Sequence, residues 1–371
     1  MGKSFIDEAM KKNPATPAVN TGDSSVPPMP GADDIELEQI LQTLKVKIKI
    51  FGCGGGGSNT ISRLSEEGVV GAEMYAVNTD AAHLLAIHAP RKLLIGRRCT
   101  KGLGAGALPE VGEQAAKENE DDLKKNVAET DIVFITCGLG GGTGTGAAPY
   151  IAKLARDAGA MVISVVTVPF KSEGNLRMLN AIHGLERIRI ASDTVIVVPN
   201  DKLLTLVPKL PLNQAFKIAD EVLMHAIKGI SEIITRPGLV NLDYSDLKTI
   251  MKGSGLAMIG IGESEDDDRA AIATNEALSS PLLDVKIDGA MGALVNVTGG
   301  PDMTVAEAEK VAEIVGQKIN PNARIIWGCR VEPDMEKTVR VMLVVTGLKE
   351  GPNVLRGTMA GASDTHLDMV R

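Results

Sequence analysis

Short apolar runs alternate with amphipathic helical patterns between residues 46 and 200. Asp131–Thr136 and Ala160–Val168 are almost continuously apolar, as in strands that are buried on both faces of a parallel sheet. Between such runs, apolar positions recur every three to four residues, which is typical of helices that cover a sheet. Glu110–Val127 is expected to form one such amphipathic helix. The pattern therefore predicts a doubly wound, Rossmann-like α/β fold whose ligand site lies at the carboxyl ends of the strands.

A long helix and a second domain are predicted next. Leu212–Ile234 carries apolar residues around nearly its whole circumference, so we expect a helix buried between two bodies. A strand pattern over Ala293–Thr298 and a capped helix over Thr304–Ile319 predict a smaller α+β domain. The expected organisation is an N-terminal extension with a flexible linker and a short helix (1–45), a ligand-binding domain (46–210), a central helix (211–236), a C-terminal α+β domain (237–347) and a flexible tail (348–371).

Composition and charge narrow the possible functions. The net charge of −8 offers no basic surplus to neutralise phosphates, which argues against a nucleic-acid partner. The four cysteines and five histidines are scattered, which suits reduced thiols and predicts no metal held by a cluster of protein side chains. Because no apolar run reaches membrane-spanning length and no signal peptide is evident, we expect a cytoplasmic protein without direct membrane insertion.

A glycine-rich loop, Cys137–Pro149, lies between a predicted buried strand and a helix expected over Ala147–Ala158. This order of strand, glycine turn and helix points backbone N–H groups and the positive end of a helix at an anion. The glycines remove side chains where the backbone must approach a ligand, and Thr143 and Thr145 add hydroxyl donors. The loop therefore predicts phosphate binding rather than a simple hinge.

A second glycine loop, Gly52–Asn59, precedes a helix expected over Asn59–Glu67. Its glycines spell the dinucleotide fingerprint G-x-G-x-x-G, and Asp80 follows the next strand pattern, where an acid could bind a ribose. Taken alone, this loop fits an NAD-binding oxidoreductase and another kind of nucleotide-binding protein equally well.

The sequence Gly-Gly-Gly-Thr-Gly-Thr-Gly at 140–146 resembles the signature loop of the tubulin/FtsZ superfamily, whose members bind GTP and polymerise. With Ala-Ala-Pro after it, the loop is most similar to the FtsZ branch. The long N-terminal extension and the divergent tail favour an archaeal member. The resemblance spans about residues 46–347, and its motifs occur in order along the whole of that stretch.

Further loops match the same family. Residues 52–59 fit its G-x-G-G-x-G-x-N loop, in which the asparagine contacts guanine; 78–80 and 101–106 resemble its second and third nucleotide loops. An oxidoreductase needs none of these additional loops, and the P-loop motif of kinases does not occur in the sequence. The contacts implied in the loops are Gly54, Gly55, Gly56, Ser58, Asn59, Asn78, Asp80, Gly104, Ala105, Gly106, Gly140, Gly141, Gly142, Thr143, Gly144, Thr145 and Gly146.

Two pairs of residues spaced four apart carry a further implication of the resemblance. Glu173 and Arg177, which follow Pro169, could be a solvated helix pair, but the family pattern puts them at the ribose and the phosphates. Phe216 and Asp220 read by themselves as a core aromatic and a surface acid. In the family they stack on guanine and accept its N1 and amine hydrogens, with Asn200 at the edge of the same pocket.

Asn241, Asp243 and Asp246 match the family's catalytic loop, Asn-x-Asp-x-x-Asp. By itself, the pattern predicts only that Asp243 caps a helix and that Asp246 lies in its first turn. The resemblance implies that these residues enter the nucleotide pocket of the next subunit and activate water there. Hydrolysis of GTP to GDP and phosphate, assisted by Mg²⁺, should then require assembly.

The resemblance implies a cytoskeletal GTPase that polymerises head to tail and forms the scaffold of the division ring at mid-cell. A relative that forms filaments without turnover is the other alternative, and the intact catalytic loop argues against it. The last residues, Leu367–Arg371, put apolar side chains at an otherwise polar end. In the family such a tail docks onto a membrane-anchoring division protein.

Overall fold

The computed structural model describes residues 46–206, 212–236, 243–283 and 287–348. The predicted N-terminal helix and linker, the last residues of the tail and Asn241 lie outside these ranges. The described chain from residue 46 onward belongs to one compact unit. None of its helices is both long and apolar enough to span a membrane.

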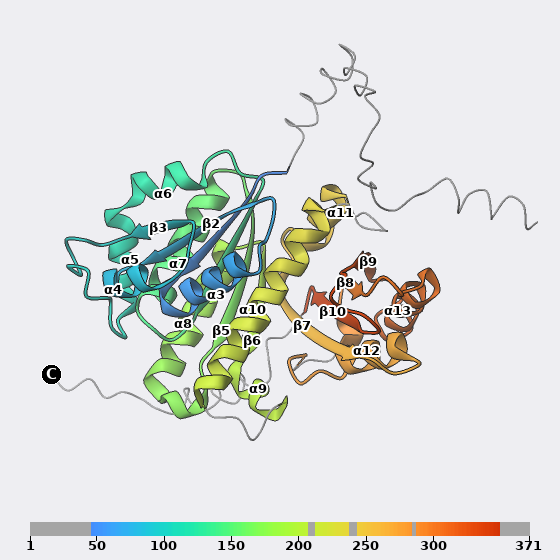
Figure 1. Cartoon of the computed structure of the whole chain (residues 1–371). Helices are drawn as coiled ribbons and strands as arrows, with labels where there is room; N and C mark the ends of the chain where they lie inside the picture. Colours follow the sequence, from blue (N-terminus) through green and yellow to red (C-terminus); the bar gives the residue numbers. More distant parts are fainter. Residues whose placement is uncertain (1–45, 207–211, 237–242, 284–286, 349–371) are drawn as a thin grey trace, which may run out of the picture. The chain divides into compact units, whose positions relative to one another are not determined.

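A ten-stranded sheet runs through this unit in the order β3-β2-β1-β4-β5-β6-β7-β10-β8-β9 (Figure 1). The strands from β3 to β7 are parallel, β10 pairs antiparallel with both β7 and β8, and β9 is parallel to β8. The strands are β1 (Ile48–Cys53), β2 (Ala72–Asn78), β3 (Arg91–Leu94), β4 (Ile132–Gly138), β5 (Met161–Val168), β6 (Thr194–Pro199), β7 (Gly255–Ser264), β8 (Gly292–Gly299), β9 (Arg324–Val331) and β10 (Val339–Thr346).

Helices cover both faces of the parallel part, which confirms the doubly wound α/β fold. Phe51 and Val133 point into one core beneath α5 to α8, whereas Ile50 and Phe134 point into the other beneath α3 and α10. The helices are α3 (Gly54–Glu66), α4 (Ala81–Ala86), α5 (Pro109–Glu118), α6 (Glu120–Val127), α7 (Thr143–Asp157), α8 (Asn175–Ala191), α9 (Asn200–Leu206), α10 (Leu212–Thr235), α11 (Tyr244–Met251), α12 (Arg269–Leu278) and α13 (Val305–Lys318).

Three helix predictions need correction. The helices expected from Asn59 and Ala147 begin earlier, because the glycines assigned to the preceding loops form the first turns of α3 and α7. The stretch expected as one helix from 110 to 127 is two helices, α5 and α6. Asn119 separates them, and its side chain accepts a hydrogen bond from the Gly96 N–H at 2.8 Å. The strand β3 and the helix α4 were not predicted.

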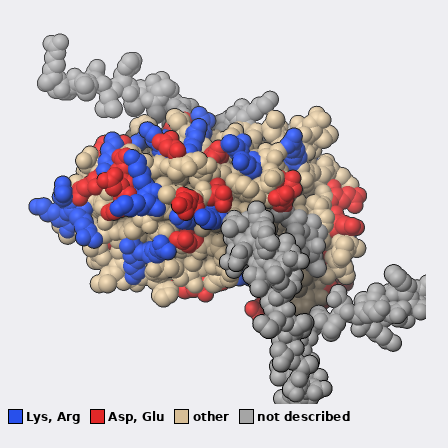
Figure 2. All heavy atoms as spheres, turned by 90° about the horizontal axis from the view of Figure 1, so that it is seen from above, with Lys and Arg blue, Asp and Glu red and all other residues tan. Residues whose placement is uncertain are grey.

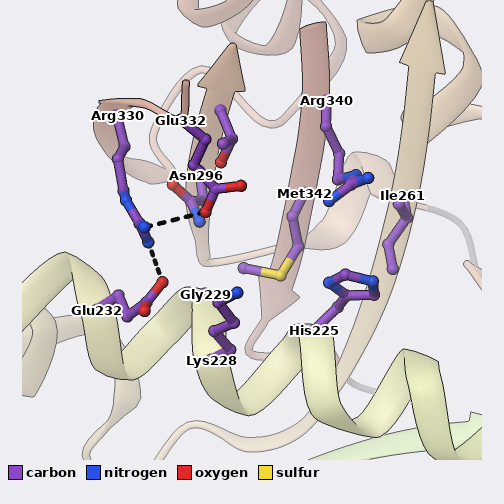
Figure 3. Close-up of a pocket in the computed structure, with 11 residues that line it drawn as sticks. His225, Lys228, Gly229, Glu232, Ile261, Asn296, Arg330, Glu332, Arg340 and Met342 are labelled. Atoms are coloured by element: carbon purple, nitrogen blue, oxygen red, sulfur yellow. Dashed lines mark hydrogen bonds and ion pairs between the residues drawn. The ribbon is translucent and has the colours of Figure 1, made fainter. Parts of the chain in front are cut away.

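The long helix α10 joins the parallel part of the sheet to its C-terminal part. It contacts β5 and β6 on one side and β8 on the other. Its Glu232, only 3 % exposed, forms an ion pair with Arg330 of β9 (Figure 3). Arg236 lies 3.4 Å from the second carboxylate oxygen of Glu232, and Glu332 lies 3.0 Å from Arg330. A buried charge network therefore fixes α10 against the C-terminal strands.

Charges of both signs are mixed over the face shown in Figure 2. Several exposed cations form ion pairs with neighbouring acids, such as Lys124 with Glu120 and Arg340 with Glu263. A surface of alternating sign does not create the one-sign potential that nucleic-acid binding uses. The described residues on this face therefore offer no basic platform.

Candidate nucleotide-binding site

A cavity of about 560 Å³ opens at the carboxyl ends of the parallel strands, within the usual range for ligand sites. It lies where the strand order reverses between β1 and β4, the position at which doubly wound sheets bind ligands. Most of the predicted contacts line it. They are Gly54, Gly55, Gly56, Asn59, Asn78, Asp80, Gly104, Ala105, Gly106, Gly141, Gly142, Thr143, Gly144, Pro169, Glu173, Arg177, Asn200, Phe216 and Asp220.

Two helix N-termini meet at one end of this cavity. α3 begins at Gly54 directly after β1, and α7 begins at Thr143 after β4. Neither helix has an acidic residue in its first turn, so the positive ends of both dipoles are left for an anion. Gly54 has a φ of 72°, and a Cβ on it would lie 2.8 Å from the Gly144 backbone nitrogen. A side chain at this position would therefore separate the two loops.

The third loop, residues 104–106, packs directly on the signature loop. The Gly142 N–H donates to the Gly106 carbonyl at 2.8 Å, and a Cβ on Gly142 would lie 2.6 Å from the same oxygen. The Thr143 hydroxyl lies 2.7 Å from the buried Thr79 hydroxyl, which links the second loop to α7. Loops that are far apart in the sequence thus form one continuous cradle.

The opposite end of the cavity suits a flat ring. Phe216 is 39 % exposed and rests edge-to-face on buried Phe170, with ring centroids 5.1 Å apart. The Asn200 side chain is buried, and its Oδ1 has no hydrogen-bond partner among the described residues. Burial raises the pKa of the Asp220 carboxyl to about 7. An aromatic face, an unpaired amide oxygen and a desolvated carboxyl are the groups that a polar heterocycle would satisfy.

Between the two ends lie Glu173 and Arg177, which form an ion pair with each other. The second carboxylate oxygen of Glu173 accepts the Phe170 N–H at 2.9 Å. These bonds fix the carboxylate at the cavity wall beside the aromatic end. The Arg177 side chain is about half exposed and can turn toward a bound anion.

The charges at the cavity wall fit a nucleotide bound together with a divalent cation. Of the described residues that line it, only Arg177 carries a Lys or Arg side chain, whereas Asp80, Glu173 and Asp220 are acids. A triphosphate would therefore depend on loop N–H groups and helix dipoles, and a hard cation would relieve the remaining repulsion. Oxygen donors near the anion end, the Asp80 carboxylate and the Thr143 hydroxyl, suit Mg²⁺.

Four predicted contacts lie outside the cavity lining. Ser58 lies within α3 and is fully buried, and Gly146 packs against α5, where a Cβ would lie 1.9 Å from a backbone oxygen. The Thr145 hydroxyl accepts the Gly140 N–H at 2.8 Å, so both residues brace the signature loop from within. Six lining residues were absent from the predicted set: His83, Leu103, Gly138, Leu139, Thr167 and Ala219. Their positions beside predicted residues were the only available signal.

The predicted catalytic aspartates lie away from this cavity. Asp243 caps α11 by accepting the Ser245 N–H at 3.3 Å, as expected, and Asp246 lies in the first turn; both are exposed. The neighbouring Tyr244 hydroxyl lies 3.5 Å from the Asp131 carbonyl, at the start of β4. The cavity is at the other end of that strand, about 20 Å away at 3.3 Å per residue. Neither aspartate can reach the cavity of its own chain.

Comparisons with known proteins agree with this geometry. Residues 47–208 match the model "Tubulin/FtsZ family, GTPase domain", and residues 255–349 match "FtsZ family, C-terminal domain". The chain is 57 % identical over 327 residues to "Cell division protein FtsZ 1" of Archaeoglobus fulgidus, covering 88 % of this chain and 89 % of that protein. It is 50 % identical over 364 residues to the protein of that name from Halobacterium salinarum, covering 97 % and 91 %.

Among solved structures, "FtsZ dimer, empty (M. jannaschii)" superposes with a TM-score of 0.83 at 52 % identity, covering 86 % of this chain and 93 % of that one. A GTPγS-bound protofilament of CetZ2 from Haloferax volcanii, at 22 % identity and a TM-score of 0.73, shares the fold. These matches decide against the oxidoreductase alternative. The chain belongs to the tubulin/FtsZ family and carries its GTPase domain followed by an FtsZ-type C-terminal domain.

Proposed function

We propose that this protein binds GTP in the cavity and hydrolyses it only after assembling head to tail with further copies of itself. One observation carries the proposal. The acids that line the cavity among the described residues are already engaged or lie at its aromatic end: Asp80 caps α4, Glu173 pairs with Arg177, and Asp220 lies beside Phe216. Two exposed aspartates, Asp243 and Asp246, stand instead at the opposite end of the sheet. Repeating this arrangement along an axis brings the aspartates of one subunit to the cavity of the next.

Each end of the cavity has a defined role in this proposal. Phe216 stacks on guanine, and Asp220 accepts the N1 and exocyclic amine hydrogens, a pair of donors that adenine lacks. Glu173 accepts the ribose hydroxyls. The amides of the glycine loops and the N-termini of α3 and α7 hold the phosphates. Ser58, Gly140, Thr145 and Gly146 shape the loops without touching the nucleotide.

Asp243 and Asp246 orient and polarise the attacking water in the cavity of the neighbouring subunit. Asn241 of the same loop lies near the γ-phosphate in this proposal. The Asp80 carboxylate and the Thr143 hydroxyl would hold a Mg²⁺ ion that arrives with the nucleotide, and the ion would supply positive charge to the phosphates. The protein's own contribution is to align water, phosphate and leaving group, and that alignment exists only at the contact between two subunits.

The relatives are named as cell division proteins, and we propose the same role here: a filament that serves as the scaffold of the division ring at mid-cell. The protein would act in the cytoplasm and reach the membrane through an anchoring division protein. Leu367–Arg371 is the segment we assign to that partner. Deleting 367–371 should leave GTP turnover unchanged and abolish recruitment to the division site.

The experiment that tests the shared site is phosphate release from GTP per mole of protein, measured with Mg²⁺ across a range of protein concentrations. Activity should be near zero below a threshold concentration and rise above it. Asp243→Asn preserves a good N-cap but removes the charge, so it should fold, bind GTP and turn over little. Asp243→Ala should do the same with a slightly weaker helix. A constant specific activity at every concentration would contradict the proposal.

Complementation gives a stricter test. Phe216→Ala weakens nucleotide binding but leaves the catalytic loop intact, whereas Asp243→Asn has the reverse defect. When the two variants are mixed, a junction between an intact cavity and an intact loop forms, so turnover should reappear. If each variant is inactive alone and the mixture is inactive as well, although both still assemble, the active site is not shared.

A further inference from the structure

The carboxyl of Asp220 is controlled by a side chain that does not line the nucleotide cavity. Arg63 projects from α3, which packs alongside the start of α10. Its Nε lies 3.9 Å from Asp220 Oδ2, and its Nη1 forms an ion pair with Glu221, the next residue of α10. Arg63 is 22 % exposed and Asp220 is 16 % exposed, so water screens their attraction only weakly.

The chemistry of guanine recognition makes the charge of Asp220 important. An ionised carboxylate accepts two hydrogen bonds, one on each oxygen, and guanine presents two neighbouring donors. A protonated carboxyl has lost one of these acceptors and adds a donor where guanine also donates. The charged groups that act on Asp220 are Arg63 from α3, which favours ionisation, and Glu221 from α10, which opposes it. Among the residues that the structure describes, only the arginine offsets the burial of the carboxyl.

We propose that Arg63 is a positioning residue that holds Asp220 in its ionised, guanine-accepting form and thereby sets the affinity for guanine nucleotides at neutral pH. The guanidinium also binds Glu221, so it neutralises the one nearby acid that would oppose ionisation. Arg63 touches no part of the nucleotide itself. The inference rests on the proposed function, because it assumes that Asp220 recognises guanine.

The expected effect follows from how much of Asp220 is ionised. With burial holding the pKa near 7, about half of the carboxyl is ionised at pH 7. Removing the Arg63 cation, 3.9 Å away, should raise the pKa of Asp220 by roughly one pH unit or more. The ionised fraction at pH 7 then falls to about one-tenth, so the Kd for GDP or GTP should rise about fivefold in Arg63→Met. Above about pH 9 the difference should close.

The test is the Kd for GDP between about pH 6 and pH 9, measured on the full chain below its assembly concentration. Arg63→Lys keeps the charge and should retain most of the wild-type affinity at pH 7. Lys228→Met is the matched control, because Lys228 pairs with Glu67 at 3.0 Å and so joins α10 to the end of α3 without approaching Asp220. It should leave the profile unchanged. The titration of the nucleotide's own phosphates is common to all variants and cancels in each ratio.

The outcomes distinguish a failure of the Arg63 inference from a failure of the proposed function. A midpoint that moves upward in Arg63→Met, with affinity restored at high pH, supports the inference. Weaker binding by the same factor at every pH, or an equal change in Lys228→Met, overturns it and leaves the proposed function standing. If Arg63→Met does not fold, Arg63→Gln replaces it as the neutral variant. In that case, pH profiles of Arg63→Lys and Arg63→Gln that are shifted equally far from wild type overturn the inference as well, because only the lysine keeps the charge. Failure of the wild type to bind GDP and GTP would overturn both.

Discussion

The ion pair between Glu232 and Arg330 provides a sharp test of how α10 is held against the C-terminal strands. The Glu232 side chain is 3 % exposed, so its charge has almost no access to water. Replacing Arg330 by methionine removes its main partner and leaves the carboxylate buried. Such a change typically costs 3–5 kcal/mol. Because Arg236 remains 3.4 Å from Glu232, we expect the lower end of that range, about 3 kcal/mol.

Arg340→Met is the matched control. Arg340 lies on β10 and lines, with Glu232 and Arg330, a small cavity between α10 and the C-terminal strands (Figure 3). It pairs with Glu263 at 2.6 Å. This pair is more exposed than Glu232, at 29 % and 45 %, so water screens it more and its loss should cost less, about 1 kcal/mol. The double variant Glu232→Met with Arg330→Met removes both buried charges and should recover most of the loss.

Urea unfolding followed by the fluorescence of Trp327 measures these differences, since the chain has one tryptophan and it lies on β9 near Arg330. GDP should be held at one saturating concentration, because bound ligand adds to stability. If Arg330→Met and Arg340→Met were equally mild, burial of Glu232 would not determine the strength of the contact. If the double variant were the least stable of the three, apolar replacement would not compensate, and the reasoning would be wrong.

Three further predictions concern the loops, the thiols and the C-terminal domain. Gly141→Ala should leave the stability against urea unchanged, because its Cβ meets no atom within 4 Å, but it should lower GTP affinity roughly tenfold. Gly146→Ala should instead destabilise the fold by roughly 1–3 kcal/mol, since its Cβ would lie 1.9 Å from a backbone oxygen of α5. Among the four cysteines, Cys99 alone should react with a thiol reagent in the folded protein, because the other three are buried. Its reaction should become faster as the pH rises from 7 to 9, because partial burial and Glu118 raise its pKa. Reaction of all four thiols would show that the cores open. A hydrogen bond from Arg269 of α12 lowers the pKa of Glu307 from 4.5 to about 2. The contribution of Glu307 to folding stability is therefore present above pH 4.5 and is lost as the pH falls toward 2. Glu307→Gln should flatten the acid-unfolding profile in that window, and an unchanged profile would contradict this.

The sequence was a good guide to the fold because each buried strand is a continuous apolar run and each covering helix has a clear period. It failed where glycine has two roles. Because glycine disfavours a helix interior, the sequence predicts loop where the first turns of α3 and α7 lie. In the structure the small residues let those turns approach the opposite loops closely. The break between α5 and α6 was hidden because Asn119 separates them through a bond to Gly96, a contact that no local pattern encodes.

The candidate site was predictable as far as motifs reached. Residues within the glycine loops and the Phe216–Asp220 pair were found, whereas Thr167 and Ala219 contribute to the cavity only through their position beside them. Thr145 shows what a motif leaves out: the sequence predicts its hydroxyl as a ligand donor, and the structure adds that this hydroxyl accepts the Gly140 N–H and so closes the loop. Arg63 could not have been found, because its importance depends on which helix packs beside α10.

α10 accounts for the separation that we propose between nucleotide binding and hydrolysis. Its first turns carry Phe216 and Asp220 at the cavity, and its end at Thr235 is about 22 Å farther along, at 1.5 Å per residue. Asp243 and Asp246, which we propose as catalytic, follow that end in the sequence, and the Glu232–Arg330 pair fixes the helix there against β9. A rigid helix of this length keeps the two halves of the chemistry apart within one chain. In the mechanism that we propose, the nucleotide is hydrolysed only at a junction between two chains, so turnover would be a property of the filament rather than of the subunit.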